Sequence, residues 1–353
     1  MTEQLAVVGA DSAAALIDPE CPDVYHTAGY GRAAASTEPG TWQLAHSTHR
    51  ILVPYVVRRL DDGTGASDAV SPYGYSGIHV GPGTTPTELA RFWDRAVHHW
   101  RDQAMVTLFL RFSPLDPQSV DAVRHLGTID LTRRADTITV PVDQGSTAIW
   151  AGMEGRSRTA IRKARNAGLE GGIRAAGIDD VAAGSPFRKL YEQTMVRVGS
   201  APGYHFPEVY YRTLVDGLGK ALLIAEVRDP GGTVVAAALV LRHRDRAHYH
   251  LAGSDPRSVR EGANNLLLWT ILEWAAENGC ALVHLGGGVR ADDGLFQFKR
   301  SFGGIRTPFW TGAVVLDPGR YAALLGTHAR NLGRTVEELR ETGYFPGYRL
   351  GRG

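Results

Sequence analysis

The chain has 353 residues, 43% of them apolar and 21% charged, which is typical of a folded globular protein and excludes a disordered or fibrous one. Its 38 basic and 37 acidic side chains give a formal net charge of +1. The net charge therefore indicates neither a nucleic acid nor a membrane partner, and such a partner would have to bind a local patch of basic residues. The length exceeds one typical domain and predicts two.

Neither a disulfide nor a membrane span is expected. Cys21 and Cys280 lie far apart in the sequence, and Cys280 opens an apolar run in which a buried thiol is the ordinary interpretation. The N-terminus has no basic region followed by an apolar stretch, and no run approaches the roughly 18 apolar residues that cross a bilayer. We expect a cytoplasmic protein without membrane insertion.

The first half of the chain indicates a mixed α/β domain. Its first forty residues have weak periodicity and are expected to be partly irregular. A Gly- and Pro-rich loop with two tyrosines covers Ser71-Pro-Tyr-Gly-Tyr-Ser-Gly77. Apolar patterning predicts strands at 51–57, 105–112 and 131–142 and a helix at 87–100. We take residues 1–150 as this domain.

A basic helix is predicted next. Five basic residues and no acidic one lie between Arg156 and Leu169, with Ser157 as a candidate cap at the start and Gly168 at the end. A solvated helix face and a phosphate-binding face are both open interpretations.

The pattern from residue 221 onward predicts a three-stranded antiparallel meander, then a long helix and one further strand parallel to the third. The strands are expected at 222–227, 233–241, 246–252 and 281–285, and the helix at 260–277. This order resembles the core of the acetyltransferase-like (GNAT) fold, in which the strands on either side of the helix splay apart to admit an acyl donor. The fold class expected for the whole chain is α/β with mixed sheets, in two GNAT-like acyltransferase domains.

An ordered set of motifs resembles the Fem family of aminoacyl-tRNA-dependent transferases. The set comprises the loop Pro72–Gly77, Ile161-Arg-Lys-Ala-Arg-Asn-Ala-Gly168, the segment Tyr191–Gly199, Gly253-Ser254 followed by Gly262–Trp269, and Leu285-Gly-Gly with Asp293–Gly304. The family adds amino acids to peptidoglycan precursors and, in actinobacterial pathways, to small antibiotic scaffolds. The resemblance implies a second domain at 151–315 and a first domain completed by residues 316–353.

The resemblance also implies a reaction, the transfer of an aminoacyl group from charged tRNA to the amine of a small or peptidyl acceptor. The acceptor would be a peptidoglycan precursor or a peptidyl natural product such as a nucleoside antibiotic. Exchanging an ester for an amide needs positioning and charge stabilisation, so no cofactor or metal is expected besides the tRNA co-substrate. His248-Tyr-His250 lacks the third ligand of a zinc site.

Candidate roles follow for individual residues. Lys299, among Phe296, Phe298 and Phe302, is the candidate to stabilise the oxyanion or the leaving 3′ end. His250 and Asp293 are candidate bases, although a strand histidine is more often simply hydrogen-bonded. The resemblance assigns substrate binding to Tyr73, Tyr75, Arg197, Tyr204 and Asn264, and it assigns tRNA binding to Arg158, Arg162, Lys163 and Arg165. Structural roles remain the alternative for each.

Two rival functions remain. An acyl-CoA N-acyltransferase would carry a Gln/Arg-x-x-Gly-x-Gly/Ala loop before the long helix, but Val259-Arg-Glu-Gly-Ala-Asn264 departs from it at both ends and places Glu261 where a pyrophosphate would bind. A non-catalytic tRNA- or peptide-binding module is the second rival. The oligomeric state does not follow from the sequence.

Overall fold

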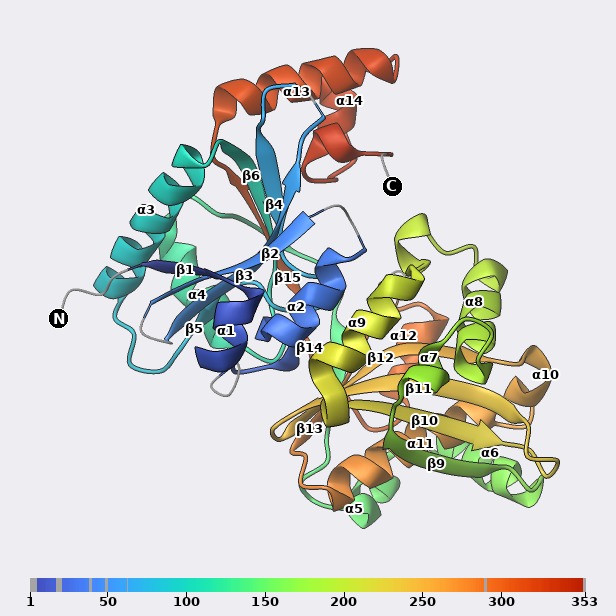
Figure 1. Cartoon of the computed structure of the whole chain (residues 1–353). Coiled ribbons are helices and arrows are strands. Elements are labelled where there is room, and N and C mark those ends of the chain that lie inside the picture. Colours follow the sequence, from blue (N-terminus) through green and yellow to red (C-terminus); the bar gives the residue numbers. More distant parts are fainter. Residues whose placement is uncertain are drawn as a thin grey trace. The chain divides into compact units, whose positions relative to one another are not determined.

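The computed structural model describes residues 5–16, 21–37, 40–47, 50–61, 63–288 and 291–351 (Figure 1). The chain forms two compact units. Unit 1 comprises Met1–Arg134 and Phe309–Gly353, and unit 2 comprises Ala135–Pro308. Within the described ranges, no helix has the length and apolar character needed to cross a membrane.

Unit 1 is built on one mixed sheet. Its strand order is β1-β2-β3-β4-β6-β15-β7, and β5 pairs with β3. The strands are β1 (Ala6–Gly9), β2 (Gly40–Ser47), β3 (Ile51–Arg59), β4 (Ser67–Val70), β5 (His79–Val80), β6 (Met105–Arg111), β7 (Asp130–Arg133) and β15 (Trp310–Val315). The α-helices are α1 (Ala10–Leu16), α2 (Ala28–Ala35), α3 (Pro86–Asp102), α4 (Pro117–Val123), α13 (Pro318–Asn331) and α14 (Val336–Glu341).

Helix α3 shows how local sequence builds this unit. A capping box closes its start, since Thr85 Oγ1 accepts from the Glu88 N–H and the Glu88 carboxylate accepts from the Thr85 N–H. Its buried residues recur at helical spacing, at Leu89, Phe92, Trp93, Ala96 and Trp100. They pack against the sheet in one core cluster, so the amphipathic pattern fixes both the helix and its contact face.

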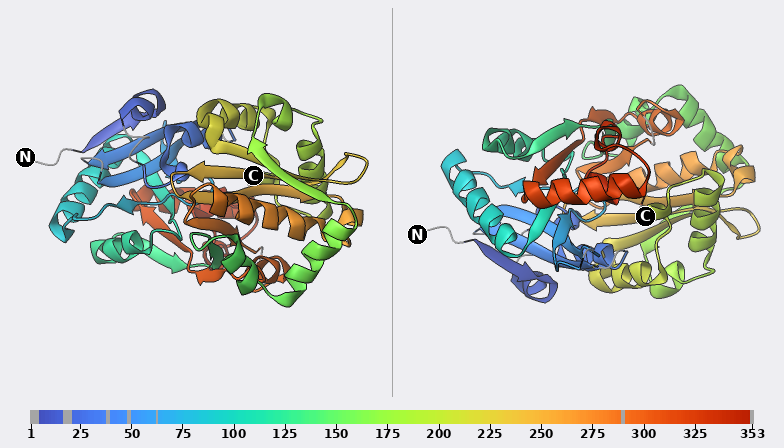
Figure 2. Two further views of the ribbon diagram at one scale, coloured as in Figure 1. Left: turned by 90° about the horizontal axis from the view of Figure 1, so that it is seen from below. Right: turned by 90° about the horizontal axis from the view of Figure 1, so that it is seen from above.

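The C-terminal segment belongs to the same unit as the N-terminal strands. Strand β15 inserts between β6 and β7 as an antiparallel neighbour of both, so segments far apart in the sequence lie side by side (Figures 1 and 2). The fully buried Asp68 carboxylate on β4 accepts hydrogen bonds from Arg58, Tyr348 and Arg349. This charge cluster anchors the end of the chain.

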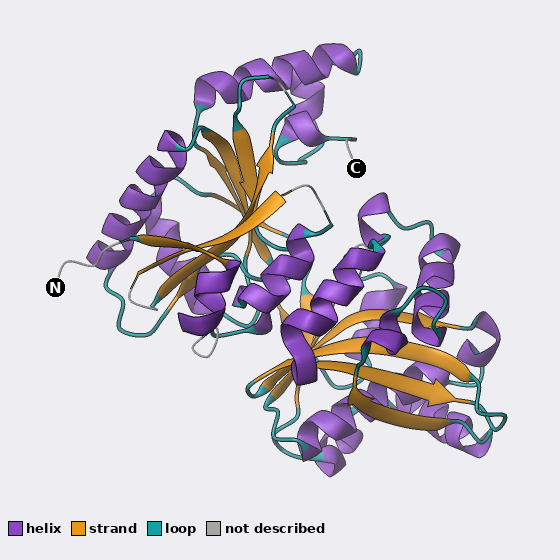
Figure 3. Ribbon diagram, in the orientation of Figure 1, coloured by secondary structure: helices purple, strands orange, loops and turns teal. Residues whose placement is uncertain are grey.

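Unit 2 has a second mixed sheet, with helices on either side of it (Figure 3). Its strand order is β14-β8-β13-β12-β11-β10-β9. The strands are β8 (Thr137–Pro141), β9 (Glu170–Ala175), β10 (Leu222–Arg228), β11 (Val234–His243), β12 (Arg246–Ser254), β13 (Leu282–Gly287) and β14 (Ile305–Thr307). The α-helices are α5 (Ser146–Gly152), α6 (Gly155–Asn166), α7 (Ile178–Val181), α8 (Pro186–Arg197), α9 (Glu208–Leu218), α10 (Pro256–Val259), α11 (Ala263–Glu277) and α12 (Gly294–Arg300).

The predicted core of unit 2 is confirmed. Strands β10, β11 and β12 form an antiparallel meander, α11 follows, and β13 then pairs with β12 in parallel. Helix α11 packs with α6, whose inward residues Ile161 and Ala164 share one apolar core with Leu267 and Ile271. The predicted α/β class with mixed sheets is therefore the observed fold, and unit 2 has the predicted order of elements.

Three expectations were wrong. Residues 131–142 are not one strand, because β7 belongs to the first sheet while β8 pairs with β13 in the second. The units accordingly divide after Arg134 and after Pro308, whereas the sequence placed these boundaries at 150 and 315. A Thr-Ile-Thr-Val alternation predicts a strand but carries no information about which sheet will receive it.

The start of the chain is more regular than expected, since β1, α1 and α2 lie within the first forty residues. Seven of the eight residues of α2 are buried, so the helix has no polar face and gives no periodic signal. Ser157 is not the cap of the basic helix either. Glu154 occupies that position, while the buried Ser157 hydroxyl bonds to that of Ser301.

Candidate active site

The two central parallel strands of unit 2 separate to form a fork. They pair only at Arg246 with Leu282, Ala247 with Val283 and His248 with His284, although β12 continues to Ser254 and β13 to Gly287. The register against β11 slips at the same point, with Leu251 opposite Leu239 and Tyr249 opposite Val240. His250 is therefore the extra residue of a β-bulge, which turns β12 away from β13.

Lys299 spans the mouth of this fork. It lies on α12, is 7% exposed, and its Nζ donates to the Gly287 carbonyl at the end of β13 over 2.7 Å. The same Nζ lies 5.9 Å from the ring centroid of Tyr249 on β12. Burial lowers the pKa of Lys299 to about 8, opposed by the nearby Asp293 carboxylate. Below pH 8 the fork thus holds a largely desolvated ammonium.

His250 is hydrogen-bonded from a second element. Its Nε2 lies 2.7 Å from the hydroxyl of Tyr210 on α9, and the Tyr210 ring is buried and stacked on Phe206 at 4.3 Å. Burial, with a smaller contribution from His248, lowers the pKa of His250 to about 3. The imidazole is therefore neutral at pH 7 and a weak base. No sequence pattern pointed to Tyr210, because forty residues separate it from its partner His250.

Asp293 is the N-cap of α12, where its carboxylate accepts from the Phe296 N–H over 2.8 Å. This contact fixes the start of the short helix that carries Lys299. The helix-like turn expected around Lys299 is thus confirmed, and Asp293 acts on Lys299 through both position and charge.

The loop before α11 is fixed by close packing. Gly262 has a φ of +92°, and a Cβ there would lie 2.3 Å from the Ala160 carbonyl oxygen. Because Gly262 is the N-cap residue, α11 begins without a side-chain cap. The half-buried Asn264 lies in this first turn, and the exposed Glu261 precedes it.

The basic helix is confirmed as α6, but its cations make internal contacts. Arg158 donates to the carbonyls of Trp150, Ala151 and Met153 at the end of α5. Arg162 lies over the Trp150 ring, Lys163 donates to the Arg260 carbonyl over 2.8 Å, and Arg165 lies 3.9 Å from Glu273. Lys163 is thus the member that reaches the loop before α11.

Two predicted substrate residues lie at the end of α8 and in the turn that follows it. The Arg197 guanidinium donates to the Ser254 carbonyl, and the Thr194 hydroxyl accepts from the Ser254 N–H. Tyr204 is 44% exposed, and its carbonyl accepts from the Tyr191 hydroxyl. These contacts tie α8 to the strand end.

Tyr73 and Tyr75 belong to unit 1. Tyr73 accepts at its carbonyl from the Tyr30 hydroxyl, and the Tyr75 ring meets those of Tyr25 and Phe309 edge-on at 5.8 and 5.2 Å. They form an aromatic cluster separate from the unit 2 fork residues in sequence and in sheet.

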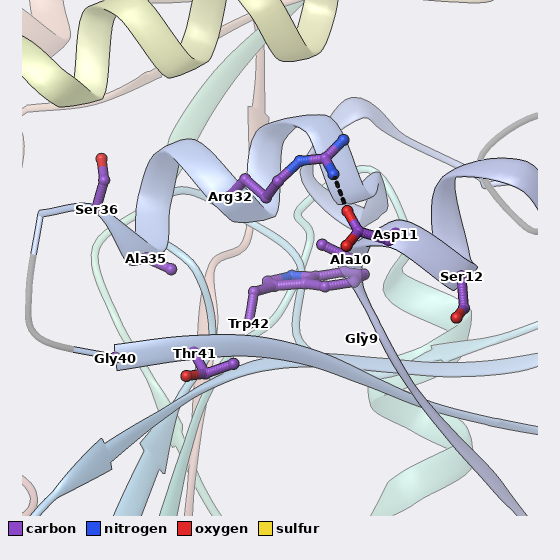
Figure 4. Close-up of a pocket in the computed structure, with 10 residues that line it drawn as sticks. All are labelled: Gly9, Ala10, Asp11, Ser12, Arg32, Ala35, Ser36, Gly40, Thr41 and Trp42. Carbon is purple, nitrogen blue, oxygen red and sulfur yellow. Dashed lines mark hydrogen bonds and ion pairs between the residues drawn. The ribbon is translucent and has the colours of Figure 1, made fainter.

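Unit 1 also contains a cavity of about 580 Å³ that no motif predicted (Figure 4). Trp42 lies along it, and Arg32 and Asp11 form an ion pair of 2.8 Å at its edge. Among the residues that the structure describes, no group of three or more His, Cys, Asp or Glu side chains is arranged to hold a metal ion.

Comparison with known proteins gives one family match and several solved structures of similar fold. Residues 155–300 match the family described as the acetyltransferase (GNAT) domain. No curated protein sequence gives a match.

Among solved structures, FemX superposes with a TM-score of 0.68 at 12% identity, over 91% of this chain and 99% of FemX. The C-terminal domain of a putative lysylphosphatidylglycerol synthetase from Agrobacterium fabrum gives 0.54 at 12% identity, over 88% and 91%. A tandem GNAT protein from the clavulanic acid biosynthesis pathway gives 0.53 at 13% identity, over 89% and 99%.

At these identities the structural likeness concerns the fold, and it extends over nearly the whole chain. Unit 2 therefore carries a GNAT-type acyltransferase domain, within a chain that has the two-sheet fold of FemX and of the tandem GNAT proteins.

Proposed function

We propose that this protein transfers an aminoacyl group from a charged tRNA to the amine of a small or peptidyl acceptor. The observation that carries the proposal is Lys299 Nζ at the mouth of the β12–β13 fork, 2.7 Å from the Gly287 carbonyl and largely out of water. The fold shared with FemX and with a lysylphosphatidylglycerol synthetase domain supports aminoacyl transfer as the class of reaction.

The choice of donor rests on the start of α11. A pyrophosphate bound there would meet the exposed Glu261, and like charges in that position repel. The 3′ end of a tRNA can bring its ester carbonyl into the fork without a pyrophosphate that the start of α11 would have to bind. Lys163 on α6 donates to the Arg260 carbonyl in the loop before α11, and we propose it as a cation that contacts a backbone phosphate.

In the proposed reaction, the acceptor nitrogen attacks the ester carbonyl and forms the new C–N bond. The bond from that carbon to the ribose 3′ oxygen then breaks, and the proton released by the amine leaves on the ribose oxygen. Negative charge develops on the carbonyl oxygen between these events. A buried ammonium at Lys299 stabilises that charge more strongly than one in water would.

His250 does not serve as the general base in this proposal, because a group with a pKa of about 3 competes poorly for the proton of an amine. Its neutral ring is instead held beside the bulge by the hydrogen bond with the Tyr210 hydroxyl. The amine loses its proton to the departing ribose oxygen, so no separate base is required.

The test compares two donors with one protein preparation. The protein is incubated with radiolabelled aminoacyl-tRNA, and separately with labelled acetyl-CoA, each with a panel of peptidyl and small amines. We expect amide formation from the charged tRNA, abolished by prior ribonuclease treatment. Transfer from acetyl-CoA alone, unaffected by ribonuclease, would refute the tRNA donor and favour the acyl-CoA alternative.

A further inference from the structure

We propose that unit 1 carries a binding site for an oxyanion, a carboxylate or a phosphate, attached to a planar ring, with Arg111 as the anion-binding group. The site lies where β4 and β6 end, among the residues of the loop 71–77. The site includes Tyr73 and Tyr75, which the family resemblance assigns to substrate binding, but the inference is argued from contacts within unit 1 and is tested by binding alone.

The strand ends in unit 1 remain joined beyond the parallel ladder. After Val70 pairs with Phe109, the Ser71 N–H donates to the Phe109 carbonyl over 2.8 Å. The Ser71 hydroxyl accepts from the Arg111 N–H, and Ser76 then pairs with Phe112. The loop 71–77 therefore lies over the end of β6 and fixes the backbone of Arg111.

The Arg111 side chain is held in one orientation. Its Nε donates to the Gly74 carbonyl over 2.9 Å, and its guanidinium carbon lies 5.9 Å from the Tyr73 ring centroid and 5.6 Å from that of Phe309. Contact with two aromatic rings stabilises a cation without neutralising it. The Arg111 side chain is thus already ordered in the free protein, so ligand binding loses little of its conformational entropy.

No carboxylate pairs with this guanidinium among the described residues, and its two terminal nitrogens make no hydrogen bond to them. Several other arginines in the described part of the chain are different. Arg58, Arg174 and Arg188, for example, each bind an acidic side chain. The terminal N–H groups of Arg111 are therefore available to donate to a planar or tetrahedral oxyanion.

The surroundings define what else the ligand carries. Tyr25 and Tyr30 are buried and support the loop from behind, through a ring contact to Tyr75 and a hydrogen bond to the Tyr73 carbonyl. Arg111 and the rings of Tyr73, Tyr75 and Phe309 are only partly buried. Partly exposed aromatic faces beside a cation favour a planar group next to the anion.

The experiment measures binding by ligand-observed NMR titration, with phenyl phosphate, benzoate and phenol as probes and the full-length protein. We expect at least one of the two aromatic anions to bind and phenol to bind much more weakly. Tighter binding of phenyl phosphate assigns the site to phosphate esters, and tighter binding of benzoate assigns it to carboxylates.

Arg111→Gln is expected to weaken anion binding by about tenfold or more, since it removes a charge-assisted pair. Arg111→Lys should retain only part of the anion affinity, because an ammonium lacks the planar pair of N–H donors of a guanidinium. The matched control is Arg124→Gln, which removes another arginine of unit 1 that lies over a ring, that of Trp310 at 4.4 Å. This control should bind within about twofold of the original protein.

Circular dichroism and thermal unfolding establish that each variant is folded. Equal binding by the original protein and a folded Arg111→Gln variant would overturn the inference, as would equal binding of phenol and the two anions. Because the readout is binding and not acyl transfer, a protein that fails with charged tRNA can still pass this test, and the reverse also holds.

Discussion

The two units share one order of strands and helix, but they differ at the ends of their two parallel strands. In unit 1, β2, β3 and β4 form an antiparallel meander, α3 follows, and β6 pairs with β4 in parallel. In unit 2 the same order is β10, β11 and β12, then α11, then β13. The unit 1 strands are joined past their ladder through Ser71 and Ser76, whereas the unit 2 strands part at the His250 bulge.

The helices that follow the meanders differ in how their N-termini are capped. Glu88 places its own carboxylate at the start of α3, and the hydrogen bonds from Thr85 lower the pKa of that carboxyl. Helix α11 starts at Gly262 with no side-chain cap. A shared topology thus leaves an open fork and an uncapped helix start in one unit, and joined strands and a capped helix start in the other. Topology alone therefore does not define a site.

The largest expected effect comes from removing the ammonium of the open fork. Lys299→Ala should lower kcat for aminoacyl transfer by roughly a hundredfold to a thousandfold, the loss typical of one oxyanion donor. Steady-state kinetics with charged tRNA measure it, and Lys189→Ala, an exposed lysine on α8, is the control. Near-normal turnover of the Lys299 variant would show that its ammonium does not stabilise the oxyanion.

The second prediction concerns the buried charge of unit 1. Asp68→Asn leaves Arg58 and Arg349 without the carboxylate that both contact, and it should reduce the free energy of unfolding by about 3 kcal/mol. Denaturant unfolding measures the change. Asp121→Asn, which alters an exposed pair with Arg124, should cost less than about 0.5 kcal/mol. An equal cost for both variants would contradict the anchoring role of Asp68.

A third prediction uses the pKa of about 8 at Lys299. The pKa is lowered, so the ammonium is present below pH 8 and is lost as the pH rises through that value. Lys299→Arg keeps its charge throughout. The ratio of kcat of the original protein to that of Lys299→Arg should be constant below pH 8 and fall about tenfold per unit above it. A constant ratio up to pH 10 would exclude the ammonium as the active form.

The smallest expected effect is at the bulge. Tyr210→Phe removes the hydroxyl that holds His250 and should cost about 1 kcal/mol in stability, with about a threefold loss of kcat. The neighbouring Tyr211→Phe is the control, because its hydroxyl makes no hydrogen bond to the described residues. A larger loss from Tyr211→Phe than from Tyr210→Phe would remove the orienting role of Tyr210.

Local patterns were sufficient for much of unit 2. Alternation and turn residues predicted the meander, apolar spacing predicted α11, and Gly279 marked its end, because each of these signals depends on residues close together in sequence. The motif from Asp293 to Gly304 likewise indicated the short helix α12. The roles assigned to individual side chains remain predictions, for Lys299, His250 and Asp293 as for Tyr73, Tyr75, Arg197, Tyr204, Asn264 and the cations of α6.

What the sequence by itself determined was the core elements of unit 2 and the fold class. The tertiary structure decided which sheet receives β8, that Tyr210 meets His250, and that the fork of unit 1 is closed by its own loop. These features depend on pairings between segments far apart in the chain, and such pairings are selected by packing and hydrogen-bond satisfaction across the whole unit and not by local preference.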